Sequence, residues 1–235
     1  MQADHDIARA QAEAARAGLE LRQDSGGLVL TDGKLELRAV FAHMLPRLKS
    51  GALQRELLVK AARIKGVDEP VAIDATAGLG EDSLLLAAAG FRVRLFERDP
   101  VIAALLCDAI TRAVNDPVLA PFVARMAPVE GDSLQALAAV GVSAENAPDV
   151  VYLDPMFPGR TKSAAVKKKF QLLHHLERPC SDERAMLDAA IAAGPRKIVI
   201  KRPVKGPYLA GMKPSHSVAG KAVRYDVLVL PRKEA

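Results

Sequence analysis

The chain has 235 residues, which suits one sizeable α/β domain with a small attachment and is too short for two full catalytic domains. Hydrophobic residues make up 50% and charged residues 26%, as in ordinary globular proteins, while an aromatic content of 4% disfavours a binding surface built on many stacked rings. The two cysteines, Cys107 and Cys180, have no metal-ligand spacing; they argue against a disulfide scaffold or a metal site and fit a reducing compartment.

The net charge of +5 is concentrated in two short stretches. Residues 159–178 carry six basic side chains and one acid, and residues 195–205 carry five basic side chains and no acid. The two stretches together carry +10, so the remaining residues sum to −5. This pattern suits a polyanionic partner, although a solvated lysine-rich surface explains the charge equally well.

Targeting and membrane segments are not expected. The chain begins without a basic stretch followed by an apolar core, which argues against a signal peptide. The longest apolar stretch, around residues 84–90, is far too short to span a bilayer. We therefore expect a cytoplasmic protein.

The first third of the chain predicts a small α+β extension over residues 1–66 that precedes a larger domain over residues 67–235. Residues 3–18 predict an alanine-rich helix. Alternating apolar residues broken by glycine turns predict an antiparallel hairpin or meander over 19–41, and residues 52–65 predict a second helix. No catalytic motif is evident here, and the role of this extension stays open.

From residue 71 onward, strands and helices alternate. The expected strands are 71–76, 92–98, 126–131, 149–154, 197–203 and 225–230, and the expected helices are 82–89, 100–114, 133–139 and about 182–193. This alternation predicts a Rossmann-like α/β fold with a mostly parallel, doubly wound sheet. Because no helix is expected between Pro203 and Tyr225, the last two strands should form an antiparallel hairpin.

A glycine-rich turn leaves the first strand of the larger domain. Asp74 ends this strand, and Gly78 and Gly80 let the backbone turn tightly before the next helix. In doubly wound folds a nucleotide binds at this place. Glu97 ends the second strand and can accept hydrogen bonds from two ribose hydroxyls, although an ordinary surface glutamate is the alternative.

The acids near this turn favour S-adenosylmethionine over a dinucleotide. Ser83 occupies the place of the third glycine of the dehydrogenase fingerprint. Glu81 and Asp82 would repel a pyrophosphate but suit the sulfonium and ammonium of S-adenosylmethionine. Asp132, after the third strand, either lies near the adenine or caps the following helix.

The fourth strand ends in the most informative stretch, Asp154-Pro155-Met156-Phe157. An exocyclic amine on a base is a poor nucleophile because its lone pair is delocalised into the ring. The Asp154 carboxylate and a nearby backbone carbonyl can accept its two N–H bonds and turn the lone pair toward a methyl group, and Pro155 fixes the loop. Phe157 could stack on an extruded base. The alternatives are a plain strand-ending turn and a loop anchor.

These residues resemble a known family. DATAGLGED, FERDP, YLDPMFP, KSAAVKKK and IVIKRP look like motifs of the bacterial small-subunit ribosomal RNA methyltransferase J family. The resemblance covers roughly residues 28–230 and is most specific over 71–203. It implies a class I methyltransferase fold and methylation of N2 of a guanosine near the 3′ end of 16S rRNA.

Carried over by position, the resemblance implies cofactor contacts at a set of residues around the strand ends. They are Glu81, Asp82, Glu97, Arg98, Asp132, Ser133 and Asp154. The chain departs from the family pattern at Glu81, where arginine is frequent, and at Asp132, where a small polar residue is frequent. The segment before the first strand of the larger domain also has fewer glycines.

We therefore expect an rRNA guanine-N2 methyltransferase that uses S-adenosylmethionine, acts as a monomer on 16S rRNA or the small ribosomal subunit, and needs no metal. The residues expected to hold RNA phosphates are Arg160, Lys162, Lys167, Lys168, Lys169, Lys201 and Arg202. Methylation of another RNA base or a protein amine, and a non-catalytic RNA-binding assembly factor, are the alternatives.

Overall fold

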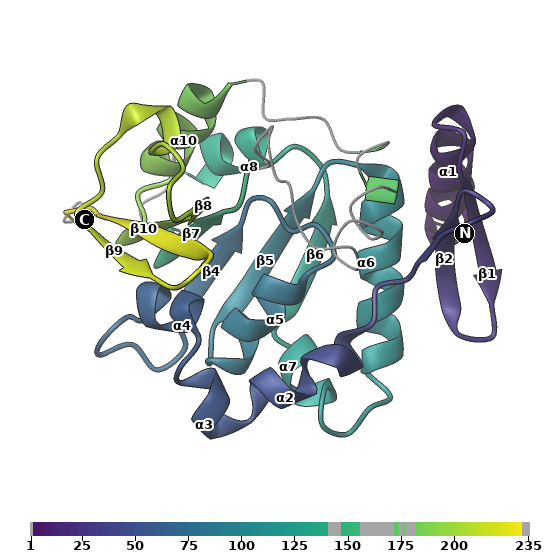
Figure 1. Ribbon diagram of the computed structural model, residues 1–235, viewed down its shortest axis with the longest axis horizontal. Helices are drawn as coiled ribbons and strands as arrows, with labels where there is room; N and C mark the ends of the chain where they lie inside the picture. Colours follow the sequence, from purple (N-terminus) through teal and green to yellow (C-terminus); the bar gives the residue numbers. More distant parts are fainter. Residues whose placement is uncertain (1, 141–146, 156–171, 174–175, 177–181, 232–235) are drawn as a thin grey trace.

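The computed structural model describes residues 2–140, 147–155, 172–173, 176 and 182–231. Its centre is a seven-stranded sheet with the order β6-β5-β4-β7-β8-β10-β9, which confirms the expected Rossmann-like fold (Figure 1). The strands are β4 (Val71–Asp74), β5 (Arg92–Glu97), β6 (Met126–Glu130), β7 (Val150–Leu153), β8 (Lys197–Pro203), β9 (His216–Ala219) and β10 (Val223–Val229).

Only β10 runs against its neighbours within this sheet. β10 pairs antiparallel with β8, as expected of the last two long strands, and also with β9. The strand β9 was not predicted, because it is a short edge strand whose side chains are mostly exposed and lack the alternating apolar pattern.

Helices cover both faces of the sheet, and two hydrophobic clusters lie between the layers. The helices are α4 (Leu57–Ala62), α5 (Glu81–Ala88), α6 (Pro100–Ala113), α7 (Ala120–Val123), α8 (Ser133–Val140) and α10 (Glu183–Ala192), with a 3₁₀ turn, η3 (Leu209–Gly211). Along β7, Val150 and Tyr152 belong to the cluster with α4, α5 and α6, while Val151 and Leu153 belong to the cluster with α8 and α10. Successive side chains of a strand point to opposite faces, so a strand covered on both sides is apolar throughout.

The first part of the N-terminal extension, residues 2–37, lies beside α6, at one side of the large sheet (Figure 1). The elements of the extension are α1 (Gln2–Arg16), β1 (Glu20–Asp24), β2 (Gly27–Thr31), β3 (Glu36–Leu37), η1 (Phe41–Met44), α2 (Leu45–Leu48) and α3 (Ser50–Leu53). The three strands form an antiparallel meander, as expected. Ala10 and Ala14 of α1 are fully buried and belong to the same hydrophobic cluster as α5 and α6.

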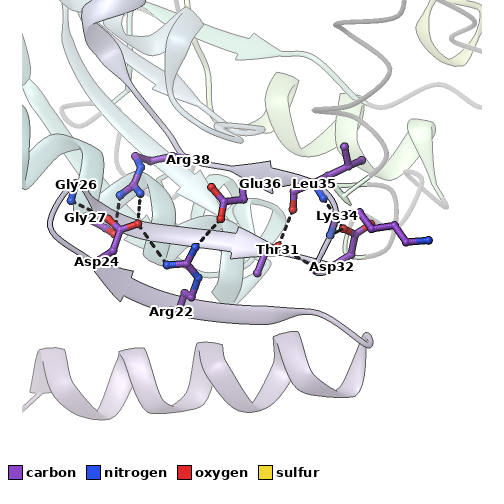
Figure 2. A network of polar contacts seen from close by, with 11 residues as sticks. Arg22, Asp24, Gly26, Gly27, Thr31, Asp32, Lys34, Leu35, Glu36 and Arg38 are labelled. Carbon is purple, nitrogen blue, oxygen red and sulfur yellow. Dashed lines mark hydrogen bonds and ion pairs between the residues drawn. The ribbon is translucent and has the colours of Figure 1, made fainter.

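Short polar contacts fix the turns of the meander (Figure 2). Asp24 accepts from the backbone N–H of Gly26 at 2.7 Å and from Arg38 at 2.6 Å. Asp32 accepts from the backbone N–H groups of Lys34 and Leu35. The bonds from backbone N–H groups are the contacts that make aspartate favourable in turns, and the Arg38 contact ties the first turn to the residue that follows β3.

The expected single helix over residues 52–65 is wrong, because the structure breaks it into α3 and α4. Glu56 lies between them with an extended backbone (φ −58°, ψ 129°). Its carboxylate accepts two hydrogen bonds from Arg47, at 2.8 and 2.7 Å. Leu53 and Leu58 on either side are both buried, so the break lets both short helices pack on the core.

Within the described part of the chain, no helix is long and apolar enough to cross a membrane. The same residues contain no group of three or more histidine, cysteine, aspartate or glutamate side chains arranged to hold a metal ion.

Candidate active site

The order of the sheet reverses between β4 and β7, and this reversal places two strand ends side by side. Asp74, at the end of β4, is in register with Tyr152 of β7. Beyond the strands, the backbone N–H of Asp154 donates to Thr76 Oγ1 at 2.7 Å. Ligands of doubly wound folds bind at such a reversal, outside the carboxyl ends of the strands. Thr76 therefore ties the glycine-rich turn to the loop that carries Asp154.

The two glycines of the turn have different structural roles. Gly78 has a φ of +54° and donates its N–H to Glu97 Oε2 at 2.9 Å. Gly80 has a φ of +78° and precedes the first turn of α5. A Cβ at Gly80 would collide with Leu106 of α6, so this glycine allows α5 to pack closely on its neighbour.

Glu97 is held at the end of β5 by backbone groups. Its Oε2 accepts from Gly78, and its Oε1 accepts from the N–H of Asp99 at 2.9 Å. Burial raises the pKa of Glu97 above its ordinary value, against the effect of these hydrogen bonds. Each carboxylate oxygen has a second lone pair, so this fixed group retains the capacity to accept from two hydroxyls of a ligand.

A pocket of about 710 Å³ opens at these strand ends, which is within the range of small-molecule sites. Seven of the residues predicted from the sequence line it. They are Gly78, Glu97, Arg98, Asp132, Ser133, Asp154 and Pro155. Asp132 also accepts from the N–H of Leu134 at 2.9 Å, so it caps α8 and lines the pocket at once.

Four other residues predicted to bind the cofactor do not line this pocket: Asp74, Gly80, Glu81 and Asp82. The expectation of direct contact is corrected for Asp74, which is 1% exposed and accepts from Ser83 Oγ and the N–H of Thr76. Burial raises its pKa to about 7. Asp74 thus acts on the site through the turn that it anchors. Glu81 is exposed on the first turn of α5.

Asp82 belongs to a buried polar network on the other side of the strand reversal. Its Oδ2 accepts from Lys201 Nζ at 2.6 Å and from the Tyr152 hydroxyl at 2.6 Å. Lys201 Nζ also lies 3.0 Å from Asp154 Oδ2. Burial alone would raise the pKa of Asp82, but Lys201 and Tyr152 hold it below its ordinary value. We call Lys201, Asp82 and Asp154 the lysine triad.

The structure corrects the assignment of Lys201 and Arg202 to RNA phosphates. Lys201 is 19% exposed and its ammonium is bound to two carboxylates. The Arg202 side chain is 0% exposed, and its Nε donates to the Pro207 carbonyl at 2.8 Å. Both residues lie on β8, an inner strand of the sheet, and their cations are bound to groups of the protein itself. The sequence showed the charge but not its burial.

The remaining predicted residues lie outside the described part of the chain. They are Phe157, Arg160, Lys162, Lys167, Lys168 and Lys169. Their proposed roles in base stacking and phosphate binding stay predictions.

One wall of the pocket was not predicted at all. Four residues from the middle of α1 to just beyond its C-terminal end also line the pocket: Arg9, Glu13, Arg16 and Ala17. Arg9 also pairs with Glu130 at the end of β6 at 2.7 Å. The sequence predicts this helix from its composition, but nothing in its pattern predicts which partner it docks against.

A family model described as a putative SAM-dependent methyltransferase matches residues 8–230. A protein of Thioalkalivibrio sulfidiphilus named ribosomal RNA small subunit methyltransferase J is 40% identical over 94% of this chain and 92% of its own length. A protein of the same name from Pseudomonas aeruginosa is 43% identical over 89% of this chain and 77% of its own.

A solved structure is also similar to this chain. The crystal structure of a SAM-dependent methyltransferase from Neisseria gonorrhoeae superposes with a TM-score of 0.72 at 31% sequence identity. The match covers 90% of this chain and 83% of the other. It therefore includes both the sheet and most of the N-terminal extension.

Proposed function

We propose, from the premise that the chain belongs to the SAM-dependent ribosomal RNA small subunit methyltransferase J family, that it methylates the exocyclic N2 of a guanosine near the 3′ end of 16S rRNA. The observation that carries this proposal is the position of Asp154 and Pro155, which line the same pocket as Glu97. A small-subunit RNA substrate places the reaction in the bacterial cytoplasm.

The chemistry of the pocket fits S-adenosylmethionine. Glu97 is fixed by two backbone N–H groups and is suited to accept from the ribose hydroxyls. Asp132 and Ser133 would contact the adenine, and Gly78 would let the backbone approach the methionine end. When bound, the cofactor supplies an electrophilic methyl group on a sulfonium and leaves as a thioether. The acidic lining suits that positive charge.

Asp154 would hold the target amine on the other side of the pocket. A carboxylate is an acceptor only, so it can bind two neighbouring N–H groups at once. Guanine offers such a pair, N1–H beside the N2 amino group, whereas adenine and cytosine place an acceptor ring nitrogen beside their amino groups. This difference supports guanine as the base that Asp154 receives.

In the transfer, the lone pair of N2 forms the new bond to the methyl carbon while the carbon–sulfur bond breaks and its electron pair returns to sulfur. The nitrogen then releases one proton to the Asp154 carboxylate or to water. Asp154 orients the lone pair, and Pro155 limits the movement of the loop. Positioning of this kind can supply most of the rate enhancement of such a transfer.

The experiment is transfer of labelled methyl to small ribosomal subunits that lack their modifications, followed by digestion to nucleosides. We expect the label in N2-methylguanosine. Label in another nucleoside would contradict the choice of base, and label in protein would contradict the choice of RNA. No transfer by a protein that binds the cofactor would favour the non-catalytic assembly factor.

A further inference from the structure

We infer that Lys201 is a positioning residue for methyl transfer, which holds the Asp154 carboxylate in place for the target amine and balances the charge that Asp154 shares with Asp82. The inference rests on the proposed function, because it concerns the carboxylate to which that function assigns the amine. It concerns a lysine on β8 that does not line the pocket and whose place in the sequence suggested RNA binding instead.

The geometry brings three elements to one ammonium group. Lys201 Nζ lies 2.6 Å from Asp82 Oδ2 and 3.0 Å from Asp154 Oδ2. Asp82 comes from the first turn of α5, and Asp154 follows β7. All three side chains of the lysine triad are less than one-fifth exposed. Asp154 is thus held by Lys201 through its carboxylate and by Thr76 through its backbone N–H.

The charges of the lysine triad explain why this contact matters. Two carboxylates bound to the same ammonium would repel each other without it, and one of them would take up a proton. A protonated Asp154 loses acceptor capacity and no longer offers two equivalent acceptors to the amine. Lys201 therefore supplies the positive charge that keeps both carboxylates ionised together.

The molecule contains a counterexample nearby. Asp74 is also buried, but its two hydrogen-bond donors are the neutral Ser83 hydroxyl and the Thr76 N–H. Burial raises the pKa of Asp74 to about 7, whereas the pKa of Asp82 is lowered. The largest cause that lowers the pKa of Asp82, and that Asp74 lacks, is the contact with Lys201.

Other charged and titratable groups face the lysine triad from the elements packed around it. They are Arg47 of α2, Asp74 at the end of β4, Tyr152 of β7, Arg202 of β8 and Tyr225 of β10. Arg47 is already paired with Glu56, and the Arg202 guanidinium is bound to the Pro207 carbonyl. The cation that contacts both carboxylates is Lys201 Nζ.

If Lys201 only stabilised the fold, its removal would change stability but leave the pH profile of the rate flat. Replacing a buried ion pair by an apolar group often changes stability little, whereas removing one partner leaves an uncompensated charge. Lys201→Met removes the ammonium but keeps an unbranched apolar stem. Lys201→Arg keeps the charge. Lys65→Met is the matched control, because Lys65 is exposed in the loop before β4, at the opposite end of the strands from the pocket.

The test is the single-turnover rate against pH at saturating cofactor and RNA. We expect the wild type and Lys65→Met to be nearly flat between pH 6 and 8.5. We expect the rate of Lys201→Met to be lower at pH 6 than at pH 8.5 and to rise severalfold over this range, because two neighbouring carboxylates without the ammonium hold a proton more readily. Lys201→Arg should restore the flat profile. A flat profile for Lys201→Met would overturn the inference.

A second readout does not depend on RNA. In protein labelled with ¹³C at the aspartate carboxyls, the Asp154 resonance is assigned by its loss in Asp154→Asn. The pH at which this resonance shows protonation should be higher in Lys201→Met than in the wild type. Adding Asp82→Asn to Lys201→Met should reverse this shift. If Lys201→Met does not fold, Lys201→Arg still decides, because a pH profile that differs from the wild type would contradict the charge role. Failure of the proposed substrate leaves this spectrum unchanged, so the two failures are distinguishable.

Discussion

The two sides of the strand reversal hold their carboxylates by different means. On the side of β4 and β5, Asp74 and Glu97 accept hydrogen bonds from neutral donors, namely backbone N–H groups and one hydroxyl. On the side of β7 and β8, Asp82 and Asp154 share the ammonium of Lys201. Asp82 reaches this ammonium from the first turn of α5, whereas Asp154 directly follows β7.

The difference shows in how burial acts on each carboxyl group. Without a cation, burial raises the pKa of Glu97 and raises that of Asp74 to about 7. With Lys201 in contact, the pKa of Asp82 falls despite burial. Neutral donors are sufficient to orient an acceptor for ribose hydroxyls. A carboxylate that stays charged beside another one needs a cation, and Lys201 is that cation on the β7–β8 side.

The largest expected effect concerns Asp74, on the side of β4 and β5, and appears in the pH dependence of stability. Asp74 has a folded pKa raised to about 7 from 3.8, so its contribution to stability is fully present below pH 4 and is lost as pH rises toward 7. Asp74→Asn does not titrate. The difference in unfolding free energy, wild type minus variant, should therefore fall by about 3 kcal/mol between pH 4 and 7. Denaturant unfolding at both pH values measures it, and a constant difference would break the comparison.

The next effect concerns the cofactor. Glu97→Ala removes the acceptor for two hydroxyls, each worth about 1.5 kcal/mol or more with a charged partner. We expect the dissociation constant for S-adenosylmethionine to rise about 100-fold in calorimetry. Glu69→Ala is the matched control, because Glu69 is an exposed glutamate at the opposite end of the sheet. Equal affinities for the two variants would contradict the role of Glu97.

A smaller effect is expected on the side of β7 and β8, within the contacts of Asp82. Tyr152→Phe removes one donor to Asp82 but leaves Lys201 bound to the same oxygen. We expect a loss of about 1 kcal/mol in unfolding free energy and a pH profile of the rate that stays flat. A profile like that expected for Lys201→Met would show that the hydroxyl, rather than the ammonium, keeps the network charged.

The smallest effect is expected at the rim. Arg9 of α1 is 61% exposed and pairs with Glu130. Exposed ion pairs contribute about 0.2 to 1 kcal/mol and are screened by salt. Arg9→Ala should therefore lower stability by less than about 1 kcal/mol at low salt, and by less still in 1 M salt. A larger loss that persists in high salt would mean that α1 is held to the pocket by more than packing.

Much of the fold and half of the site follow from local pattern. Apolar runs that end in an acid predicted β4, β5 and β7, and they placed Asp74, Glu97 and Asp154 at one edge of the sheet. Lys201 was misread because the sequence shows its charge but not its partner, which lies 119 residues away at Asp82. The break at Glu56 was missed for the same reason, since Arg47 holds it through a contact that periodicity does not reveal.

The extension shows a further limit of sequence patterns. The helix α1 and the meander were predicted from alternation and glycine turns, but their docking was not. Gly27 shows why docking is hard to predict: a Cβ there would collide with Arg112 of α6, a residue distant in sequence. The boundary between the extension and the larger domain stays a proposal, because one hydrophobic cluster includes residues from both.

The central claim is that the two sides of the strand reversal divide the work, with Glu97 for the cofactor and Asp154 for the amine. The most direct measurement determines the cofactor dissociation constant and the single-turnover rate at saturating cofactor for the wild type, Asp154→Ala and the exposed control Asp68→Ala. We predict that Asp154→Ala keeps cofactor affinity within about tenfold and loses rate on the order of 100- to 1,000-fold, while Asp68→Ala matches the wild type. An Asp154→Ala protein that keeps its rate, or that loses only cofactor affinity, would contradict the account.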